Sequence, residues 1–304
     1  MTAPKPKRIL ILGYPYFVNR LTELGKDSAY ILSGLPKNGL RRWLSLFRAD
    51  LIYLIGGDLR PNRFYRVALL FGKKVIIHWV GTDIVEMKSW LEQGHKFCSW
   101  MLKQATHWAE VNWTAAELDQ IGVNAQVVPL TPASFPENTK EFPDKFVVLT
   151  YLPPGKARFY GEDKIIGLAL EFPEIVFLAV AASPTDRSSD WPLNMIPIGW
   201  VDNMGELYRE VVVLVRLTEH DGLSFMVLEA LAHARHVIWS YPFSGVLQAT
   251  DDAQLASTLN GLYQEFSHGK LLLNIAGRET VEHFYLPQAV WDQIEAGIKG
   301  VLAE

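Results

Sequence analysis

The fold is decided by one stretch of the chain, Asp221-Gly222-Leu223-Ser224-Phe225-Met226-Val227-Leu228-Glu229. A β-branched run precedes it at residues 211–215 and a second apolar run follows at residues 237–240, and such runs are typical of buried parallel strands. The block therefore predicts a strand, a loop, a helix and another strand. Ser224 is a favourable N-cap, so the helix would direct free backbone N–H groups and a positive dipole toward the carboxyl edge of the sheet, where phosphates bind.

Glu229 is the one charged side chain of this apolar helix. At helical spacing it shares a face with Phe225, Met226, Ala232 and His233. A carboxylate on such a face needs a ligand, a protein partner or solvent. Two interpretations stay open from the residues alone: Glu229 binds a ligand, or it belongs to the edge of a solvated stripe together with His233.

Asp221 and Glu229 are two acidic residues separated by seven others at a strand–loop–helix, and with this spacing the chain resembles the retaining nucleotide-sugar glycosyltransferases of the GT-B architecture, in particular family 4. The resemblance implies an α/β fold with two Rossmann-like domains facing across a cleft. It also implies that a sugar moves from a nucleoside-diphosphate sugar to an acceptor hydroxyl with retention.

The resemblance assigns roles within this motif. It implies that Asp221 holds hydroxyls of the donor sugar, that Glu229 holds the ribose, and that the donor also contacts Gly222, Leu223 and Ser224. Family members usually have Glu as the first acid, and Asp is shorter by about one methylene. Glu219 is therefore a second candidate for the first-acid role.

Two further segments resemble the family in the right order along the chain. After an expected strand at residues 146–150, the loop carrying Lys156 and Arg158 resembles the donor-phosphate loop; Arg can bind a pyrophosphate bidentately and Lys as a point charge. The structural alternative is two solvated surface cations. The segment from residue 195 to residue 208 resembles the strand and Gly loop before the acidic motif, which implies that Trp200 and Val201 border the nucleobase.

The first half offers its own candidates at the ends of expected strands. Gly13 and Tyr14 follow the apolar run at residues 8–12, where a glycine lets a ligand approach the backbone, and we assign them to donor binding. The segment at residues 77–83 resembles the acceptor-side Gly-Thr-Asp of some family 4 enzymes. Asp83 would orient or deprotonate the acceptor hydroxyl, or equally cap the following helix.

Two more residues of that segment need an interpretation. His78 is expected to point into the sheet as a satisfied core residue. Val80 stands where the family often has His, so the resemblance supplies no catalytic His at this position.

Composition limits the partners. The 304 residues have a formal charge of −4 and no basic run, which argues against nucleic acid as the main partner. The single cysteine, Cys98, leaves no disulfide framework and no Cys-based metal site, and fits a reducing, cytoplasmic location. No apolar run approaches the length of a membrane span. We expect no cofactor and no bound metal, with the nucleoside-diphosphate sugar as donor substrate.

Two domains and a C-terminal helix are expected. Residues 1–135 form an acceptor-side Rossmann-like domain, residues 144–284 a nucleotide-sugar-binding one, and residues 285–304 an amphipathic helix that, by the resemblance, crosses back onto the first domain. The linker at residues 129–143 contains four prolines. Further expectations are a helical stretch at residues 87–104 and a capping box that opens a helix at Thr114.

The segment at residues 40–48 has Leu40, Trp43, Leu44 and Phe47 at helical spacing beside several arginines. Such a stripe usually packs on the domain's own sheet, and this is the expectation here. It also suits a peripheral contact with an anionic membrane, on the inner face if the protein is cytoplasmic.

Two alternative functions remain. A glycosyltransferase-like binding or partner subunit without turnover is suggested by the departures from the family pattern at Asp221, at Val80 and at residues 234–236, where Ala-Arg-His replaces Gly-x-Pro. A nicotinamide-dependent oxidoreductase is the other alternative, although the chain has no complete Gly-x-Gly-x-x-Gly.

Overall fold

The computed structural model describes residues 5–186 and 190–303 and divides into two compact units. The N-terminal unit comprises the chain up to Pro132 together with the segment from Pro287 onward, and the C-terminal unit runs from Ala133 to Leu286. Most of the proline-containing linker therefore belongs to the C-terminal unit. Arg278 donates to the carbonyl of Pro136 at 2.9 Å and Arg235 to that of Lys140 at 2.7 Å, which fixes the linker there.

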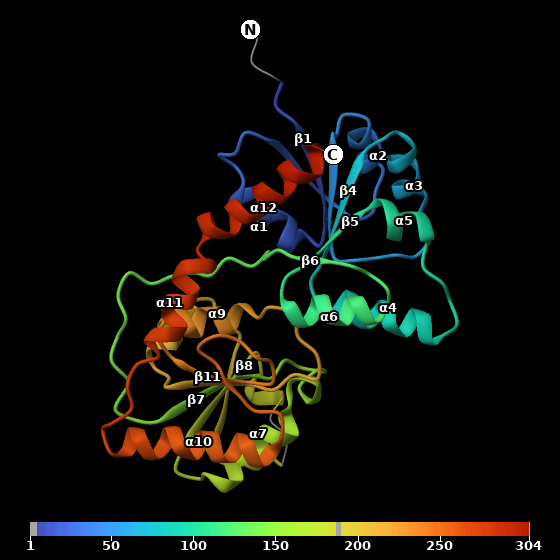
Figure 1. Ribbon diagram of the computed structural model, residues 1–304. Coiled ribbons are helices and arrows are strands. Elements are labelled where there is room, and N and C mark those ends of the chain that lie inside the picture. The colour runs from blue at the N-terminus through green and yellow to red at the C-terminus, as the bar shows by residue number, and fades with distance from the viewer. Residues whose placement is uncertain (1–4, 187–189, 304) are drawn as a thin grey trace. The chain divides into compact units, whose positions relative to one another are not determined.

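The N-terminal unit is built on a six-stranded parallel sheet in the order β2-β1-β3-β4-β5-β6 (Figure 1). Its strands are β1 (Arg8–Gly13), β2 (Ile31–Pro36), β3 (Leu51–Ile55), β4 (Lys74–Trp79), β5 (Thr106–Ala109) and β6 (Gln126–Val127). Along each inner strand, successive side chains enter opposite faces of the sheet, so that Ile9 and Leu10 belong to two different hydrophobic clusters. Both faces are buried, as a parallel sheet requires.

Helices cover both faces. Helices α1 (Pro15–Leu24) and α12 (Pro287–Ala303) share one cluster, in which Trp291 and Ile294 of α12 pack with residues of β1, β3 and β5. The opposite cluster contains buried side chains from the remaining helices of this unit, which are α2 (Arg41–Leu46), α3 (Arg63–Leu70), α4 (Thr82–Glu92), α5 (Ser99–Gln104) and α6 (Asn112–Gln120).

Some local expectations were wrong. Helix α6 begins after Val111, so Thr114 is its third residue and not its N-cap; the Thr114 hydroxyl accepts from the N–H of Val111 at 3.4 Å and donates to its carbonyl at 2.8 Å. The stretch at residues 87–104 is two helices, because the chain turns at Gly94, whose φ is +82°. The edge strand β2 was not anticipated because its residues are partly exposed and lack a clear apolar run.

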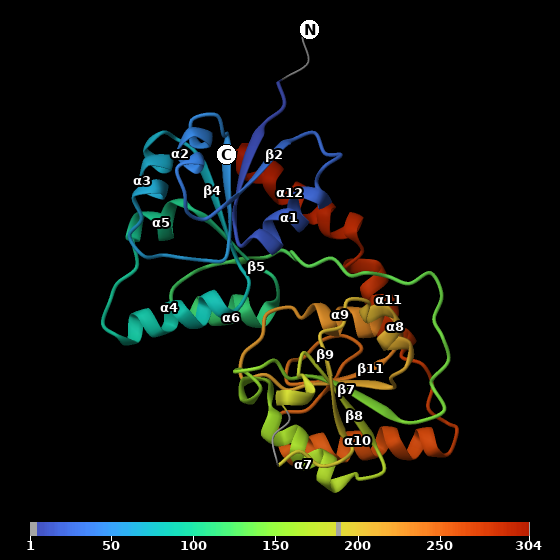
Figure 2. The same cartoon turned by 180° about the vertical axis from the view of Figure 1, so that it is seen from behind.

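The C-terminal unit repeats the architecture with strand order β12-β11-β10-β7-β8-β9, again all parallel (Figure 2). Its strands are β7 (Val147–Tyr151), β8 (Val176–Val180), β9 (Met195–Gly199), β10 (Val213–Arg216), β11 (His236–Trp239) and β12 (Leu247–Gln248). Its helices are α7 (Glu162–Glu171), α8 (Met204–Arg209), α9 (Phe225–Ala232), α10 (Asp252–Ser267) and α11 (Ile275–Phe284), with short 3₁₀ turns η1 (Arg158–Tyr160) and η2 (Pro184–Asp186). The expected α/β class with two Rossmann-like domains is confirmed.

Each sheet has one point where the strand order reverses. In the first sheet it lies between β1 and β3, and in the second between β7 and β10. Loops that leave neighbouring strands at such a point diverge to opposite faces and open a crevice at the carboxyl edge, where α/β proteins bind ligands. Within the described residues, no helix has both the length and the apolar character needed to span a bilayer.

Candidate functional site

In the C-terminal unit, the loop after β7 (residues 152–161) and the loop after β10 (residues 217–224) lie side by side at the strand-order reversal. The N–H of Glu219 donates to the carbonyl of Phe159 at 3.0 Å, joining the two loops. Gly161, at φ +77°, lies so close to Leu217 that a Cβ on it would be 2.6 Å from the Leu217 carbonyl oxygen. A glycine is required there, since a side chain would push the two loops apart.

The first loop presents two cations. Lys156 and Arg158 are both exposed, and neither side chain has an ion-pair or hydrogen-bond partner among the residues that the structure describes. Across from them, Ser224 caps α9 by accepting from the N–H of Val227 at 3.5 Å, as its sequence position predicted. The free N–H groups of α9 and the two cations thus belong to the same edge of the same sheet.

Asp221 has a partner that the sequence analysis missed. Arg216, the last residue of β10, donates through Nε and Nη2 to the two carboxylate oxygens at 2.5 and 3.1 Å. The two side chains are only 10% and 13% exposed, and Arg216 also lies over the Tyr160 ring at 5.3 Å. Burial alone would lower the pKa of Arg216, but the contact with Asp221 raises it overall. An arginine at the end of an otherwise apolar strand was the available signal.

Glu219 differs from Asp221 in this respect. Its side chain is exposed, and its carboxylate has no partner among the described residues, whereas both oxygens of Asp221 accept from Arg216. Of the two candidates for the first acid, Glu219 is therefore the one whose oxygens are open to a ligand.

Glu229 is held on its apolar helix by Tyr208, another residue that was missed. The Tyr208 hydroxyl donates to Oε2 of Glu229 at 3.2 Å, and burial, together with this carboxylate, raises the pKa of Tyr208 well above its usual value. The Tyr208 ring lies 5.3 Å from that of His233, whose pKa is lowered to about 4 by burial and by nearby arginines. His233 is therefore neutral at pH 7 and is no cationic partner for Glu229.

Trp200 and Val201 follow β9, at the edge of this sheet. Trp200 is 75% exposed, and its indole N–H donates to Asp202 at 3.1 Å. A large exposed aromatic face at the carboxyl edge of a sheet is available for stacking on a planar ligand.

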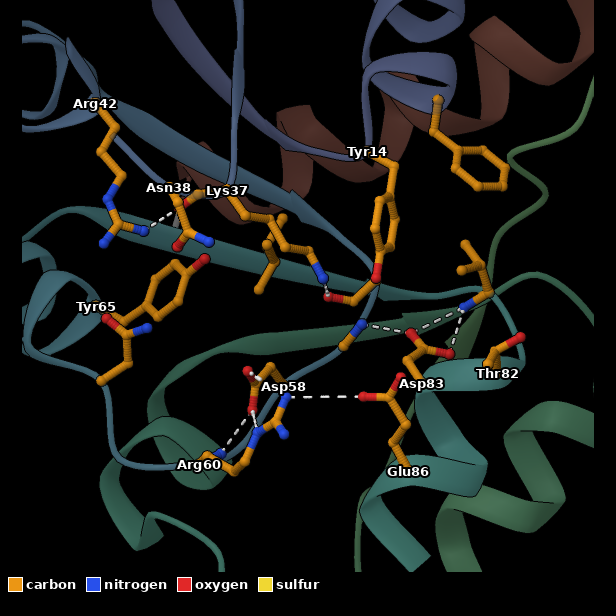
Figure 3. Close-up of a pocket in the computed structure, with 16 residues that line it drawn as sticks. Tyr14, Lys37, Asn38, Arg42, Asp58, Arg60, Tyr65, Thr82, Asp83 and Glu86 are labelled. Atoms are coloured by element: carbon orange, nitrogen blue, oxygen red, sulfur yellow. Dashed lines mark hydrogen bonds and ion pairs between the residues drawn. The ribbon is translucent and has the colours of Figure 1, made fainter. Parts of the chain in front are cut away.

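The N-terminal unit has a pocket of about 550 Å³ at its own strand-order reversal (Figure 3). Tyr14 enters it from the end of β1, and Lys37, Arg60 and Asp83 from the ends of β2, β3 and β4. Gly13, the last residue of β1, precedes Tyr14 and does not itself line the pocket. Of the residues that line the pocket, the sequence analysis considered Tyr14, Val80 and Asp83 as parts of a site. Strand β2 was not recognised, so the position of Lys37 directly after a strand was not recognised either.

Asp83 is buried in the wall of this pocket, and its carboxylate accepts four backbone N–H groups: those of Val80, Gly81, Ile84 and, through a short contact, Gly57. Burial raises its pKa against the lowering effect of these donors. Asp83 does not N-cap the following helix, because it lies in the first turn of α4, whose N-cap is Gly81; three of its four N–H donors, those of Gly57, Val80 and Gly81, precede the helix. The carboxylate ties the loops after β3 and β4 together at the rim of the pocket.

Some charged side chains of the pocket form ion pairs with one another, and others do not. Asp58 pairs with Arg60 through two hydrogen bonds of 2.9 and 3.0 Å, and Glu86 lies 3.7 Å from the same arginine. Lys37 donates to the carbonyl of Gly56 at 2.8 Å and lies 5.2 Å from the Tyr14 ring, but within the described chain it has no carboxylate partner. Burial lowers its pKa.

Arg42 is the second cation without an acidic partner in the described chain. It donates to the carbonyl of Lys37 and lies over the Phe64 ring at 4.8 Å, while its Nε is buried without a hydrogen bond. One side of the pocket is therefore cationic. His78, by contrast, is fully buried in the inner strand β4, where Tyr53 contacts Nδ1 at 2.6 Å and burial lowers the His78 pKa to about 3. The expected core position is confirmed, but Nε2 has no hydrogen-bond partner among the described residues, so the side chain is only half satisfied.

Groups of three or more His, Cys, Asp or Glu side chains that could hold a metal ion do not occur in residues 5–186 and 190–303.

Comparison with known proteins identifies the fold. No protein-family model and no curated sequence matches the chain. Among solved structures it is similar to sucrose-phosphate synthase from Thermosynechococcus elongatus (TM-score 0.73, 12% identity, 98% of this chain and 99% of that one). It is also similar to the lipopolysaccharide outer core galactosyltransferase WaaB (0.68, 12%, 96% and 99%).

A third similar structure is a putative UDP-N-acetylglucosamine 2-epimerase from Listeria monocytogenes (0.56, 13%, 97% and 96%). At these identities the likeness establishes a GT-B fold, and the reaction has to be argued from the site.

Gly161 gives a direct test of how the loop after β7 and the loop after β10 are joined. Gly161→Ala should lower the free energy of unfolding by about 3 kcal/mol, because it combines a left-handed backbone with a collision against Leu217. Gly155→Ala is the matched control: its φ is +72° but nothing lies within 4 Å of the added Cβ, so about 1 kcal/mol is expected. Urea unfolding measures both, and equal losses would show that the close approach is unimportant.

Proposed function

We propose that the protein transfers a sugar from a nucleoside-diphosphate sugar to an acceptor hydroxyl, with retention and without a bound metal. One observation carries the proposal: at the strand-order reversal of the C-terminal sheet, joined loops carry the capped N-terminus of α9, two cations and a carboxylate, and these three side chains have no partner among the described residues. Cations and helix N–H groups favour a diphosphate, and a carboxylate favours sugar hydroxyls. The GT-B fold, shared with a galactosyltransferase and a putative UDP-sugar epimerase, supports it.

Lys156 and Arg158 would stabilise the leaving diphosphate. Negative charge grows on the bridging oxygen as the glycosidic bond breaks, and preorganised positive groups at that position lower the barrier. The backbone N–H groups at Gly222, Leu223 and Ser224 would hold the ground-state phosphates. The two cations suit the task because no carboxylate of the described chain neutralises them.

The remaining donor contacts follow from the same edge. Glu229, oriented by Tyr208, would accept hydrogen bonds from the ribose, and Trp200 and Val201 would border the base. For the sugar hydroxyls we favour Glu219, since the Asp221 carboxylate is occupied by Arg216. Asp221 would then be a positioning residue that fixes the loop on which Glu219 and Gly222 lie.

The acceptor would bind in the N-terminal pocket, where Asp83 fixes the rim. Tyr14, assigned to donor binding from the sequence, lines this pocket and would offer its ring face to the acceptor instead. Lys37 and Arg42 make an acceptor with an anionic group the better fit, because an anion there would meet two cations that lack an acidic partner in the described chain. The role first considered for Asp83, direct activation of the acceptor hydroxyl, is the alternative within this proposal.

Nucleotide binding can be tested without knowing the acceptor. UDP, GDP or another nucleoside diphosphate should raise the melting temperature in the presence of EDTA, since a ligand at a hundred times its Kd adds ~2.7 kcal/mol. Glu229→Ala should reduce this stabilisation by roughly 1.5–3 kcal/mol through the lost ribose contacts. Stabilisation by NAD(P) but by no nucleoside diphosphate would contradict the proposal and favour the oxidoreductase.

Lys156→Ala and Arg158→Ala should each lower kcat for sugar transfer by ~10²–10³ while nucleotide affinity falls less, because the transition state is more charged at the bridging oxygen than the ground state. Lys145→Ala is the control, since this exposed lysine lies before β7, at the other end of the strand that leads to Lys156. The assay compares transfer rates with nucleoside-diphosphate affinities.

Three results of that assay would count against the proposal. Unchanged turnover in both variants removes the loop from the site. Nucleotide binding by an inactive wild type favours the partner subunit, and epimerised donor without transfer favours an epimerase.

Glu219 and Asp221 can be separated by comparing activity with stability. Glu219→Gln should reduce turnover at unchanged stability, because its carboxylate is exposed and has no partner in the part of the chain that the structure describes. Asp221→Asn should cost about 3 kcal/mol of unfolding free energy, because it leaves the buried Arg216 without its counter-charge. If instead Asp221→Asn is stable and inactive while Glu219→Gln is fully active, Asp221 is the sugar-binding acid.

A further inference from the structure

A cluster of large apolar side chains is exposed on one side of the N-terminal unit. It consists of Leu40 (78% exposed), Leu44 (68%), Phe47 (59%), Leu70 (77%) and Phe71 (61%), and we call it the α2–α3 surface. The first three follow one another at helical spacing along α2 and its flanking residues, which have helical φ and ψ. The Phe47 and Phe71 rings contact edge to face, with centroids 5.5 Å apart, and so join the two helices.

The structure corrects the expectation that the residue 40–48 stripe packs on its own sheet. Of its four members only Trp43 packs against the core, at the Phe64 ring 5.2 Å away, while the fully buried residue of the segment is Leu46, outside the stripe. The reason is that α2 is a short helix whose inward side is already filled by these two residues. The other apolar residues face solvent, which costs free energy unless something covers them.

The charge around this surface is one-sided. Residues 37–49 contain four Lys or Arg and residues 59–76 contain five, and neither segment contains an Asp or Glu. The chain as a whole has more acidic than basic residues, 33 against 29, so this concentration is local. Arg63 and Arg66 are exposed on α3 at helical spacing to Leu70, and Arg41 and Arg48 are exposed beside the apolar residues of α2.

We infer that the α2–α3 surface docks the protein on an anionic lipid bilayer. Apolar side chains ringed by arginines, with no acid in either segment, match a surface whose interior is apolar and whose head groups are negative. A protein partner with an acidic rim would match the charge too, but it would have to bring its own apolar face. A bilayer supplies both properties at once, and arginine stems can lie along its apolar boundary while the guanidinium groups reach phosphates.

The same elements line the pocket. Arg42 of α2 and Tyr65 of α3 enter it, as do Lys37 and Asn62 from the adjoining loops. Docking through α2 and α3 would therefore bring the cationic side of the pocket close to lipid head groups. This placement does not depend on the proposed reaction, because vesicle binding needs neither donor nor turnover.

The test is co-sedimentation of the full chain with vesicles of phosphatidylcholine alone or with phosphatidylglycerol added. Binding is expected to the anionic vesicles and to weaken at high salt. Leu44→Ser with Leu70→Ser should reduce the bound fraction at least tenfold, as two apolar side chains leave the membrane. Leu272→Ser is the control, because this leucine of the C-terminal unit is 79% exposed and so matches Leu70.

Charge is tested separately. Arg63→Glu with Arg66→Glu should abolish binding to the anionic vesicles, whereas Lys145→Glu with Lys270→Glu, exposed residues of the C-terminal unit, makes the same charge change and should leave binding intact. The substituted side chains are exposed, so circular dichroism melts should match wild type.

Three results would overturn the inference. One is the absence of binding by wild type, and another is equal loss in target and control variants. The third is a dimer in lipid-free sedimentation velocity that Leu44→Ser with Leu70→Ser dissociates while vesicle binding is unchanged, which would assign the surface to a second copy of the chain.

Discussion

The ion pair between Arg216 and Asp221 is the interaction on which the proposed donor site depends. It lies where β10 ends, nearly out of water, and it links the end of the strand to Asp221 across the loop segment that carries the exposed Glu219. Because both charges are largely desolvated, losing either partner would leave an uncompensated charge inside the protein. Arg216 of this pair also lies over the Tyr160 ring, a contact that links the loop after β7 to the end of β10. Positioning by buried electrostatics leaves the exposed groups, Lys156, Arg158 and Glu219, free for a ligand.

In the N-terminal unit a buried carboxylate also holds loops together, but its partners are backbone N–H groups. Asp83 uses four N–H groups, instead of a cation, to hold two loops at the edge of its sheet. Such bonds satisfy a buried carboxylate without consuming the nearby cations. Lys37 and Arg42 remain without a carboxylate partner in the described chain, which is why this pocket has a cationic side although its formal charges are of both signs.

Arginine and lysine side chains have different surroundings at the sheet edges and on helices α2 and α3. At the sheet edges they lie next to aromatic rings and carbonyls, in positions suited to one anionic group. On α2 and α3 they surround exposed Leu and Phe side chains, which suits an extended surface. The separation arises because α2 is too short to bury more than two of its apolar residues, so the rest of the stripe remains at the surface beside the arginines.

The sequence by itself determined the alternation of strands and helices, the acidic motif with its Ser224 cap and the candidate cations at residues 156 and 158, because these depend on local periodicity and on residues close in the chain. Only the tertiary structure decided which acid is free, since the partner of Asp221 ends a strand and that of Glu229 comes from another helix. It also decided that Leu44 and Phe47 face solvent, because helical spacing gives a side chain its direction but not what lies in that direction. The pocket beneath Tyr14 needed four strands to be set in order, and strand order in a parallel sheet is fixed by packing between distant segments.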